Sequence, residues 1–421
     1  MTKPIVALFP EASFGSALNC VGIAQQLQRQ GAIPVFLCHP SFNGVFDEYG
    51  FKEYELPSRP TARQETEETW QAFVSAHLDH FNQDPTTQLA TYVAPTWEAI
   101  VDTAIQVEQG LTQLLMRIKP DIIVLDNVIM FPAIANAGVP WVRVVSCTET
   151  EIPDPNVPPY LSGMAADDPA RPAFEESYLK VTGPAHQRYN RFRQSCGLKA
   201  LPPGQFLETS PHLNLLLAPD IIRHEREIQL PDDIFVFLDG CVREEAQFDP
   251  PALPVNDGPI VYLSFGSLGA IDTALISRMI NVFASFPARF FVNVGGFLES
   301  YQNVPDNVYL GSWFPQPSIV AQADLFIHHG GNNSYCEALY SGVPSLIMPY
   351  CWDGHDNGLR VEQTGTGQKL QRSDWTSDQL HSAMTSLLQD TDLRRRMKAL
   401  SETMRAKEGT SKAAQAILQK L

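Results

Sequence analysis

The chain has 421 residues, of which 44% are hydrophobic, and this is more than a single hydrophobic core usually accommodates, so we expect two globular domains. The 47 acidic side chains outnumber the 30 basic ones, and the formal net charge of −17 disfavours binding to nucleic acid or to anionic membranes. The seven cysteines form no CxxC pair and the first apolar run has only a few residues, which predicts a cytoplasmic protein without structural zinc, signal peptide or membrane span.

The first half of the chain alternates short apolar runs with segments of helical length. Apolar or β-branched runs occur at 5–9, 33–38, 121–126, 141–146, 213–218 and 233–238. Such alternation is typical of a mostly parallel, doubly wound α/β sheet. The segment 152–211 is rich in Pro, Gly and polar residues, and there we expect irregular helices and loops over the sheet edge.

The second half repeats this pattern after an interruption. Residues 241–258 carry acidic side chains and several prolines without periodicity, which indicates a semi-rigid connection between domains. Strands are then expected at 260–264, 289–294, 325–329 and 344–349, and a helix at 274–286. We therefore predict domains at 1–240 and 259–400, a linker at 241–258, and a last helix within 401–421 that could pack back across the cleft.

The stretch FPEASFGSALNC at 9–20 reads as a strand, a tight turn and a helix. In a parallel sheet such a turn lies at the carboxyl end of the strand, where open α/β folds bind their ligands. The polar side chains that this turn offers are Glu11, Ser13 and Ser16. We expect a ligand to lie against the N-terminus of this helix.

The clearest motif is HHGGNNSYCE at 328–337. Two glycines follow an apolar strand, and Asn333 and Ser334 begin a helix, so free backbone N–H groups and the helix dipole can face an anion, with His329 as a further donor. This arrangement suits a diphosphate, and Glu337 lies one turn further, where its carboxylate can accept hydrogen bonds from ribose hydroxyls. An ordinary tight turn is the alternative for so short a pattern.

Two upstream segments add to this motif. Trp313, in the loop GSWFPQPS, is suited to stacking on a base if it is exposed, and a core tryptophan beside a turn is the alternative. The segment SFGS at 264–267 ends the first strand of the domain, and the hydroxyl of Ser267 can supply a second phosphate contact.

Together these motifs resemble those of the inverting glycosyltransferases of family 1 with the GT-B fold, which include macrolide, other natural-product and plant small-molecule enzymes. The resemblance spans nearly the whole chain and is densest at 311–367, where WxPQ, HGGNNS, a glutamate three residues after the serine and PxxxDxxxN occur in order. It implies an α/β fold of two Rossmann-like, doubly wound domains facing each other across a cleft, the first binding a small acceptor and the second a UDP- or dTDP-sugar. It also implies metal-independent transfer with inversion, and no cofactor besides the nucleotide sugar as co-substrate.

The resemblance further implies roles for side chains of the second domain. These are Trp313 and Phe314 at the base, Gln316 and Glu337 at the ribose, Ser267, His329, Gly331, Asn333 and Ser334 at the diphosphate, and Asp353 at the sugar. The family usually has a glutamine after this aspartate, whereas this chain has Gly354, which leaves a sugar hydroxyl without its usual partner or makes room for another substituent. His355 could compensate as a sugar ligand, or it could be a solvated helix cap.

The first domain departs from the family at its catalytic base. The family motif GHxxPxxxLAxxL has its histidine where this chain has Ser16, and the aspartate that partners this histidine corresponds to Asp126. A serine hydroxyl is not basic near neutral pH. Either Asp126 accepts the proton, directly or through Ser16 or a water, or the acceptor ionises easily, as an acidic phenol, enol, carboxylate or thiol does.

The sequence allows other interpretations as well. Glu11, His77 and His80 are further candidates for the base, and a degenerate glycosyltransferase that binds nucleotide as an auxiliary protein is the alternative function. The small-residue turn and WxPQ argue against a nucleotide-sugar 2-epimerase. Segments 60–110 and 150–205 are expected to line the acceptor pocket, and their aromatic side chains indicate an apolar or aromatic small molecule unless they form core. These side chains are Phe73, Phe81, Tyr92, Trp97, Tyr160 and Tyr178. No motif indicates an oligomeric state.

Overall fold

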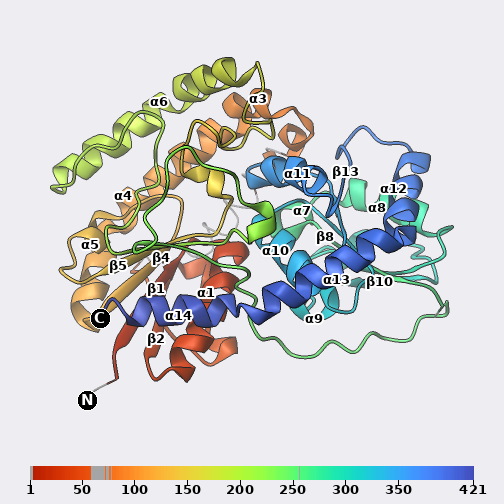
Figure 1. Cartoon of the computed structure of the whole chain (residues 1–421), viewed down its shortest axis with the longest axis horizontal. Coiled ribbons are helices and arrows are strands. Elements are labelled where there is room, and N and C mark those ends of the chain that lie inside the picture. The colour runs from red at the N-terminus through yellow and green to blue at the C-terminus, as the bar shows by residue number, and fades with distance from the viewer. Residues whose placement is uncertain (1–2, 58–71, 73–74, 77, 256) are drawn as a thin grey trace.

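The computed structural model describes residues 3–57, 72, 75–76, 78–255 and 257–421, and within these ranges the chain forms two parallel sheets (Figure 1). The seven-stranded sheet has the order β3-β2-β1-β4-β5-β6-β7, and the six-stranded sheet has the order β10-β9-β8-β11-β12-β13. In both sheets the first strand lies beside the fourth, which is the strand order of a Rossmann fold. The prediction of a doubly wound α/β fold with two Rossmann-like units is confirmed.

Alternate side chains of the first sheet enter two different cores. Val6 and Leu8 pack on the side of α1 and α14, whereas Ala7 and Phe9 pack on the side of α4. This follows from the two-residue period of a strand that helices cover on both faces. The strands are β1 (Ile5–Pro10), β2 (Ile33–Cys38), β3 (Lys52–Glu55), β4 (Ile122–Asp126), β5 (Trp141–Val145), β6 (Leu213–Leu216) and β7 (Phe235–Phe237), and the main helices are α1 (Phe14–Arg29), α4 (Ala94–Ile118), α5 (Pro132–Ala135) and α14 (Gly409–Leu418).

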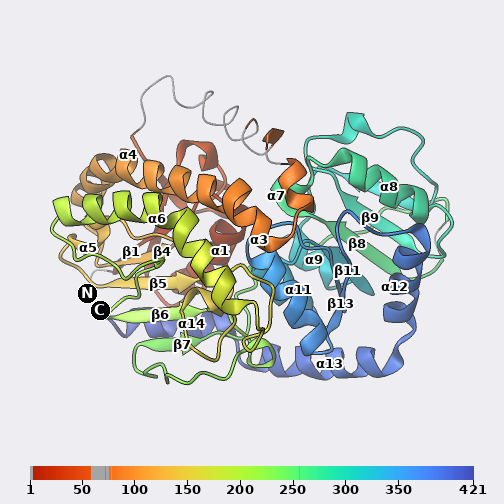
Figure 2. The same cartoon turned by 90° about the horizontal axis from the view of Figure 1, so that it is seen from above.

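The second sheet is built in the same way and lies beside the first (Figure 2). Its strands are β8 (Ile260–Ser264), β9 (Arg289–Asn293), β10 (Val308–Gly311), β11 (Leu325–His328), β12 (Ser345–Ile347) and β13 (Gly367–Lys369). Its helices are α7 (Gly266–Gly269), α8 (Thr273–Phe283), α9 (Gln316–Val320), α10 (Asn332–Ser341), α11 (Asp353–Gln363), α12 (Ser377–Gln389) and α13 (Thr391–Ala406). Short helices in the connections are η1 (Pro40–Phe42), η2 (Asp47–Tyr49), η3 (Leu78–Asn82), α3 (Pro85–Gln88), η4 (Leu89–Val93), η5 (Glu149–Glu151), η6 (Asp220–Ile222) and η7 (Leu298–Ser300).

The centre of the segment 152–211 differs from the prediction. It forms one 25-residue helix, α6 (Arg171–Ser195), which packs against α4. The expectation of irregular helices is wrong here because Gly183 and Pro184 weaken the helical pattern of the sequence without ending the helix.

The last helix leaves the second sheet and lies along α1 on the first sheet (Figure 1). Ala413, Ala414 and Ile417 of α14 are buried in the same core as Ala17 and Val21 of α1. The end of the chain therefore ties the two halves together. None of the helices in the described part of the chain combines the length and the apolar composition that a membrane span requires.

Both sheets carry polar residues at the carboxyl ends of their central strands. Asp126, at the end of β4, pairs in register with Pro10 of β1, and His328 of β11 pairs with Ser264 of β8. At these points the strand order reverses, and open α/β sheets bind ligands there. The two points face each other, because Asn332, at the start of α10, donates hydrogen bonds to backbone carbonyls just after β5.

Candidate active site

Close backbone contacts shape the turn before α10. Gly330 has a φ of +88°, and a Cβ at this position would lie 2.8 Å from the carbonyl oxygen of Gly354. A Cβ on Gly354 would in turn lie 2.5 Å from the carbonyl oxygen of His329. Only glycine fits at either position without a backbone shift. A glutamine side chain at position 354 would therefore not fit this packing unless the backbone shifted.

The side chains predicted to hold a diphosphate surround the first turn of α10. His329 stacks on the ring of Tyr350 with centroids 5.0 Å apart, and burial lowers the pKa of His329 to about 4, so the ring is neutral at neutral pH. Gly331 is the N-cap residue of α10, and Asn333 is half-buried in its first turn. The side chain of Ser267 lies outside the described residues.

The two residues predicted to hold the ribose contact each other. Gln316 donates from Nε2 to Glu337 Oε2 over 2.7 Å and to Ser334 Oγ over 3.2 Å. Arg243, in the predicted linker, donates from Nη1 to Glu337 Oε1 over 2.9 Å. Burial raises the pKa of Glu337, and the guanidinium opposes this. The sequence gives no local signal for Arg243, because its partner is distant in the chain.

Trp313 and Phe314 occupy opposite environments. Trp313 is 52% exposed, and its ring lies 5.5 Å from that of Phe14, at the start of α1. The exposed indole therefore lies where the two halves of the chain meet. Phe314 is buried against Tyr262 and Phe248 in the core of the second sheet, so its ring points away from the exposed indole, and its place at the base stays a prediction. Adjacent residues in a loop point to opposite sides, and the motif alone does not show which one faces the cleft.

Asp353 and His355, which are predicted to bind the sugar, make different contacts. Asp353 Oδ2 accepts a hydrogen bond of 2.8 Å from the backbone N–H of Asn332, at the N-terminus of α10. Burial raises the pKa of Asp353 to about 7. His355 is buried, and its Nε2 lies 2.8 Å from Oε1 of Gln88 in the N-terminal half, so it is not a solvated cap. Its described contact joins the two halves of the chain, and its role as a sugar ligand stays a prediction.

Ser16 and Asp126 come together through a residue that the sequence interpretation missed. Ser146 donates a hydrogen bond of 2.6 Å to Asp126 Oδ1, and Ser16 Oγ lies 3.2 Å from Ser146 Oγ. Asp126 is 1% exposed, and burial raises its pKa to about 8. Ser146 follows the apolar run at 141–145 directly, so the rule that strand ends share one edge could have identified it.

Three further carboxyl groups lie near Asp126. Glu11 donates its backbone N–H to the carbonyl of Asp126 over 2.7 Å, and burial raises the pKa of its side chain to about 7. The pKa of Glu151 is raised to about 8, mainly by burial, and the carboxyl groups of Glu11 and Asp353 act in the same direction. Among the other candidates for the base, His77 lies outside the described residues. His80 lies in η3, a short helix in the connection between β3 and β4.

Buried hydrogen bonds hold the two halves together beside these carboxyl groups. Asn332 Nδ2 donates to the carbonyls of Ser146, Cys147 and Leu217 over 2.8 to 3.0 Å. Asp356 of α11 accepts bonds from the Thr150 hydroxyl and from the backbone of residues 161 and 163. Sequence reasoning missed both residues, because neither motif nor periodicity indicates a partner on the opposite half.

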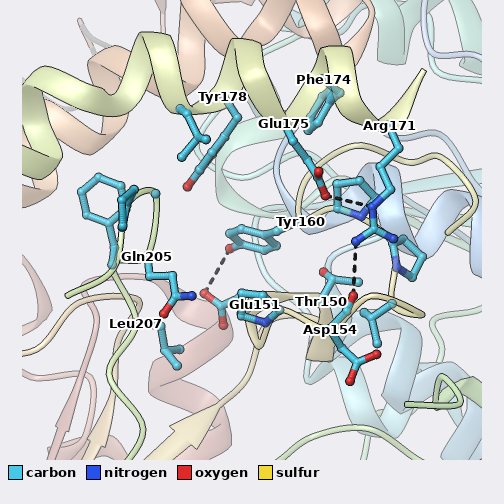
Figure 3. Close-up of a pocket in the computed structure, with 18 of the residues that line it drawn as sticks. Thr150, Glu151, Asp154, Tyr160, Arg171, Phe174, Glu175, Tyr178, Gln205 and Leu207 are labelled. Atoms are coloured by element: carbon cyan, nitrogen blue, oxygen red, sulfur yellow. Dashed lines mark hydrogen bonds and ion pairs between the residues drawn. The ribbon is translucent and has the colours of Figure 1, made fainter. Parts of the chain in front are cut away.

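A cavity of about 260 Å³ opens between α6 and the loop that follows β5 (Figure 3). Its aromatic lining comprises Trp97, Tyr160, Phe174, Tyr178 and Phe206. Glu151 projects into it from the loop side, whereas Glu175 and Arg171 belong to α6 and form an ion pair of 2.8 Å. The volume is near the lower end of the range for small-molecule sites.

The predicted aromatic residues divide between this cavity and the core. Trp97, Tyr160 and Tyr178 line the cavity, whereas Phe81 and Tyr92 pack with Tyr350 in a buried cluster. Phe73 lies outside the described residues. The described residues contain no group of three or more His, Cys, Asp or Glu side chains that could hold a metal ion.

Comparison with known proteins identifies relatives of both halves. Residues 288–419 match the family model of the C-terminal domain of erythromycin biosynthesis protein CIII-like proteins. The chain is 25% identical over 318 residues to oleandomycin glycosyltransferase of Streptomyces antibioticus. The aligned region covers 73% of this chain and 71% of that protein. It is 26% identical over 241 residues to NDP-glycosyltransferase YjiC of Bacillus subtilis (strain 168), covering 57% of this chain and 61% of the relative.

Solved structures match the whole arrangement of the two sheets. The glycosyltransferase of kitacinnamycin superposes with a TM-score of 0.72 at 20% identity, over 100% of both chains. The glycosyltransferase VinC, solved in complex with dTDP, superposes with a TM-score of 0.67 at 16% identity, over 99% of both chains. The fold, the motif residues around α10 and the curated relatives agree: the chain is a glycosyltransferase with the GT-B fold.

Proposed function

We propose that this enzyme transfers a sugar, with inversion and without a metal ion, from a UDP- or dTDP-sugar to a small apolar or aromatic natural product. The observation that carries the proposal is the position of the α10 N-terminus, which bears the donor motif and contacts the β5 end of the opposite half. The aromatic cavity lies on that opposite half. The names of the relatives, which include an oleandomycin enzyme and a VinC complex with dTDP, support the choice of substrates.

The donor lies along the start of α10 in this proposal. Its base stacks on Trp313, and its ribose hydroxyls bind the paired side chains of Gln316 and Glu337. The diphosphate accepts hydrogen bonds at the helix N-terminus, where the helix dipole favours negative charge. The diphosphate ligands in this proposal are Ser267, His329, Gly331, Asn333 and Ser334.

The sugar lies between α10 and α11. Asp353 accepts bonds from its hydroxyls, and the backbone at Gly354 offers no side chain in place of the family's glutamine. We therefore expect a donor sugar that lacks a hydroxyl at the corresponding position or presents a different substituent there. Deoxysugars are the natural class of candidate, because they do not leave an unpaired hydroxyl against Gly354.

The reaction is a single displacement at the anomeric carbon. The acceptor oxygen attacks the face opposite the diphosphate, and the charge that develops on the leaving diphosphate is stabilised by His329, Ser334 and the N–H groups of α10. Positioning and leaving-group stabilisation contribute more than a general base, which accounts for about 10²- to 10⁴-fold. The family histidine is replaced by Ser16, so the proton goes to a carboxyl such as Asp126, or the acceptor ionises easily.

Each of the two domains binds one of the two substrates in this proposal. We propose an acceptor domain at 1–240, a linker at 241–258 that acts as a hinge, and a donor domain at 259–400. The helix α14, at the end of the chain, packs on the acceptor domain and limits how far the hinge opens.

Mass spectrometry of reactions with a panel of UDP- and dTDP-sugars and of alcohol, phenol, carboxylic acid, amine and thiol acceptors tests the proposal. Transfer that gives a product of inverted anomeric configuration supports it. The variants Asp126→Asn and Ser16→His, run beside the wild type, report on the base. Nucleotide binding without transfer to any acceptor, even for Ser16→His, would instead support the alternative function as a nucleotide-binding auxiliary protein.

A further inference from the structure

One carboxyl group belongs both to the acceptor cavity and to the acidic group at the strand ends. Glu151 ends the short helix η5, which follows β5, and it lines the cavity (Figure 3). The hydroxyl of Tyr160, also in the cavity wall, donates a hydrogen bond of 3.1 Å to Glu151 Oε1. The other carboxylate oxygen, Oε2, has no hydrogen-bond or ion-pair partner among the described residues, and the side chain lines the cavity, so this oxygen can accept a hydrogen bond from a bound molecule.

Asp126, the family's remaining catalytic position, has a different environment. It is 1% exposed and is not among the residues that line the cavity. The Ser146 hydroxyl donates a hydrogen bond of 2.6 Å to one of its carboxylate oxygens, and the thiol of Cys20 lies 3.9 Å from the other. Ser16 is also buried and is not part of the cavity wall. An acceptor bound in the cavity therefore reaches Glu151 before it reaches either of these residues.

Glu151 also lies beside the second half of the chain, because the adjacent Thr150 donates its hydroxyl to Asp356 of α11 over 2.8 Å. Among the charged groups that influence it are Asp353 of α11, the predicted sugar ligand, and Glu11 at the end of β1. It thus lines the cavity, where the acceptor is expected, on a loop that contacts α11, the helix that begins with the expected sugar ligand Asp353. A general base must occupy this position, because it has to contact the acceptor hydroxyl as that hydroxyl approaches the anomeric carbon.

We infer that Glu151 is a catalytic residue of this enzyme, the general base that takes the place of the family histidine, an inference that rests on the proposed glycosyl transfer. As the acceptor oxygen forms its bond to the anomeric carbon, the bond from that carbon to the diphosphate oxygen breaks. The bonding electron pair leaves with the nucleoside diphosphate. The proton of the acceptor hydroxyl moves to the Glu151 carboxylate, and it is released to solvent after the product departs.

The protonation of Glu151 sets the pH dependence. Its pKa is raised to about 8 by burial, with Glu11 and Asp353 acting in the same direction and the Tyr160 hydrogen bond and Arg143 opposing them. Tyr178 and Cys147 also face this region, and their pKa values are raised, so they stay neutral. The active form is the carboxylate, so the rate rises with pH and levels off above the pKa of the base.

The first test is Glu151→Gln, with a weakly acidic alcohol as acceptor. We expect kcat to fall about 10²- to 10⁴-fold and the acid limb of the pH profile to disappear, while calorimetric titration with UDP and dTDP gives unchanged affinity. With an acidic phenol or thiol as acceptor the loss of rate is smaller, because such an acceptor ionises without a general base. The matched control is Glu175→Gln, a carboxyl in the same cavity that is paired with Arg171, and this variant keeps the acid limb.

A second variant tests the base without removing it. Tyr160→Phe deletes the hydrogen bond that lowers the pKa of Glu151, so the acid limb moves to higher pH while transfer continues. A residue that only supports the cavity wall would change the acceptor KM and leave the limb in place. This measurement also decides the question if Glu151→Gln fails to fold in thermal melts.

The outcomes separate the inference from the proposal on which it rests. If the wild type transfers sugar and Glu151→Gln keeps both its rate and its acid limb, Glu151 is not the base and only this inference is overturned. If in that case Asp126→Asn abolishes the limb, the base is Asp126. If the wild type transfers no sugar to any acceptor, the proposed function and this inference are both overturned.

Discussion

The Asp356 carboxylate accepts a hydrogen bond of 2.8 Å from the hydroxyl of Thr150, and this bond crosses from one half of the chain to the other. The same carboxylate accepts backbone N–H groups of Leu161 and Gly163 at 3.1 and 2.9 Å. Asp356 is buried, so its charge is satisfied only while the halves are closed on each other. One side chain therefore couples the second half of the chain to the loop that lines the aromatic cavity.

Replacing this residue should loosen the closed arrangement. In Asp356→Ala the donors of the opposite half, which also include the Thr148 hydroxyl, lose a charged acceptor, and we expect the free energy of unfolding to fall by about 1–3 kcal/mol. Small-angle scattering should give a larger radius of gyration, and kcat should fall because the two halves no longer align. Thr150→Val, which removes one donor to Asp356 and leaves the carboxylate in place, is the matched control and should have the smaller effect. A variant as compact and as stable as the wild type would contradict the role of Asp356.

The pair of Arg243 and Glu337 should matter far more than an ion pair at the surface. Arg243→Ala leaves the buried Glu337 carboxylate without its cation, and we expect a loss of about 3–5 kcal/mol in chemical denaturation. The affinity for UDP should also fall, since Gln316 and Glu337 lose their fixed geometry.

The control for this variant is the exposed pair of Arg29 and Glu244, which joins the same linker to α1. Arg29→Ala should leave the free energy of unfolding almost unchanged, because solvent screens this pair. If the two variants lost the same free energy of unfolding, the buried pair would stabilise the fold no more than the exposed pair does.

Adjacent aromatic residues should give opposite phenotypes. Trp313→Ala removes an exposed indole, and we expect UDP and dTDP to bind about 5- to 150-fold more weakly with little change in stability. Phe314→Ala removes a buried ring, and we expect a loss of about 3–5 kcal/mol in stability. Calorimetric titration and denaturant melts of both variants measure the two effects. If Phe314→Ala bound UDP and dTDP weakly and lost no stability, Phe314 would contact the nucleotide and would not be a core residue.

The sequence predicted the fold because the fold is repetitive. Apolar runs at a regular spacing indicate buried parallel strands, and a glycine turn before Asn333 and Ser334 indicates a helix N-terminus at a strand end. Both features are local in the chain. The motif residues of the donor half therefore lie together as the spacing implies, around α10 and α11.

The contacts between the halves could not be predicted in the same way. Ser146, Glu151 and Asp356 depend on which loops meet across the cleft, and no spacing along the chain encodes this. His355 was interpreted as a sugar ligand or a solvated cap, yet it contacts Gln88, a residue far away in the sequence. Only the strand-end rule would have pointed to Ser146, since it follows a strand adjacent to β4.

Restoring the family glutamine should not restore a sugar contact. In Gly354→Gln the new Cβ would lie 2.5 Å from the carbonyl oxygen of His329, so the turn before α10 has to move. We expect a lower melting temperature and weaker binding of the nucleotide sugar. Gly183→Ala, in α6 with no atom within 4 Å of the new Cβ, should be neutral or slightly stabilising and serves as the control. A stable Gly354→Gln variant with a broader donor range would contradict the steric argument.

The raised pKa of Asp126 makes a prediction about stability that is independent of activity. Its pKa is 3.8 in an ordinary environment and about 8 in the folded protein, so the folded state binds the proton more tightly. The stability that this proton provides is fully present below about pH 4 and is lost as the pH rises through about 8.

We therefore expect the melting temperature of the wild type to fall between pH 5 and pH 8.5, with Glu11 and Asp353, whose pKa values are about 7, acting in the same direction. Asp126→Asn, which cannot ionise, should flatten this fall and be more stable than the wild type at pH 8.5, by an amount on the order of 1 kcal/mol. The control is Asp84→Asn, because hydrogen bonds from Thr87 lower the pKa of Asp84, so its contribution is lost only at acid pH. This control should keep the fall between pH 5 and pH 8.5, whereas an equally steep fall in Asp126→Asn would show that the Asp126 carboxyl is ionised at neutral pH.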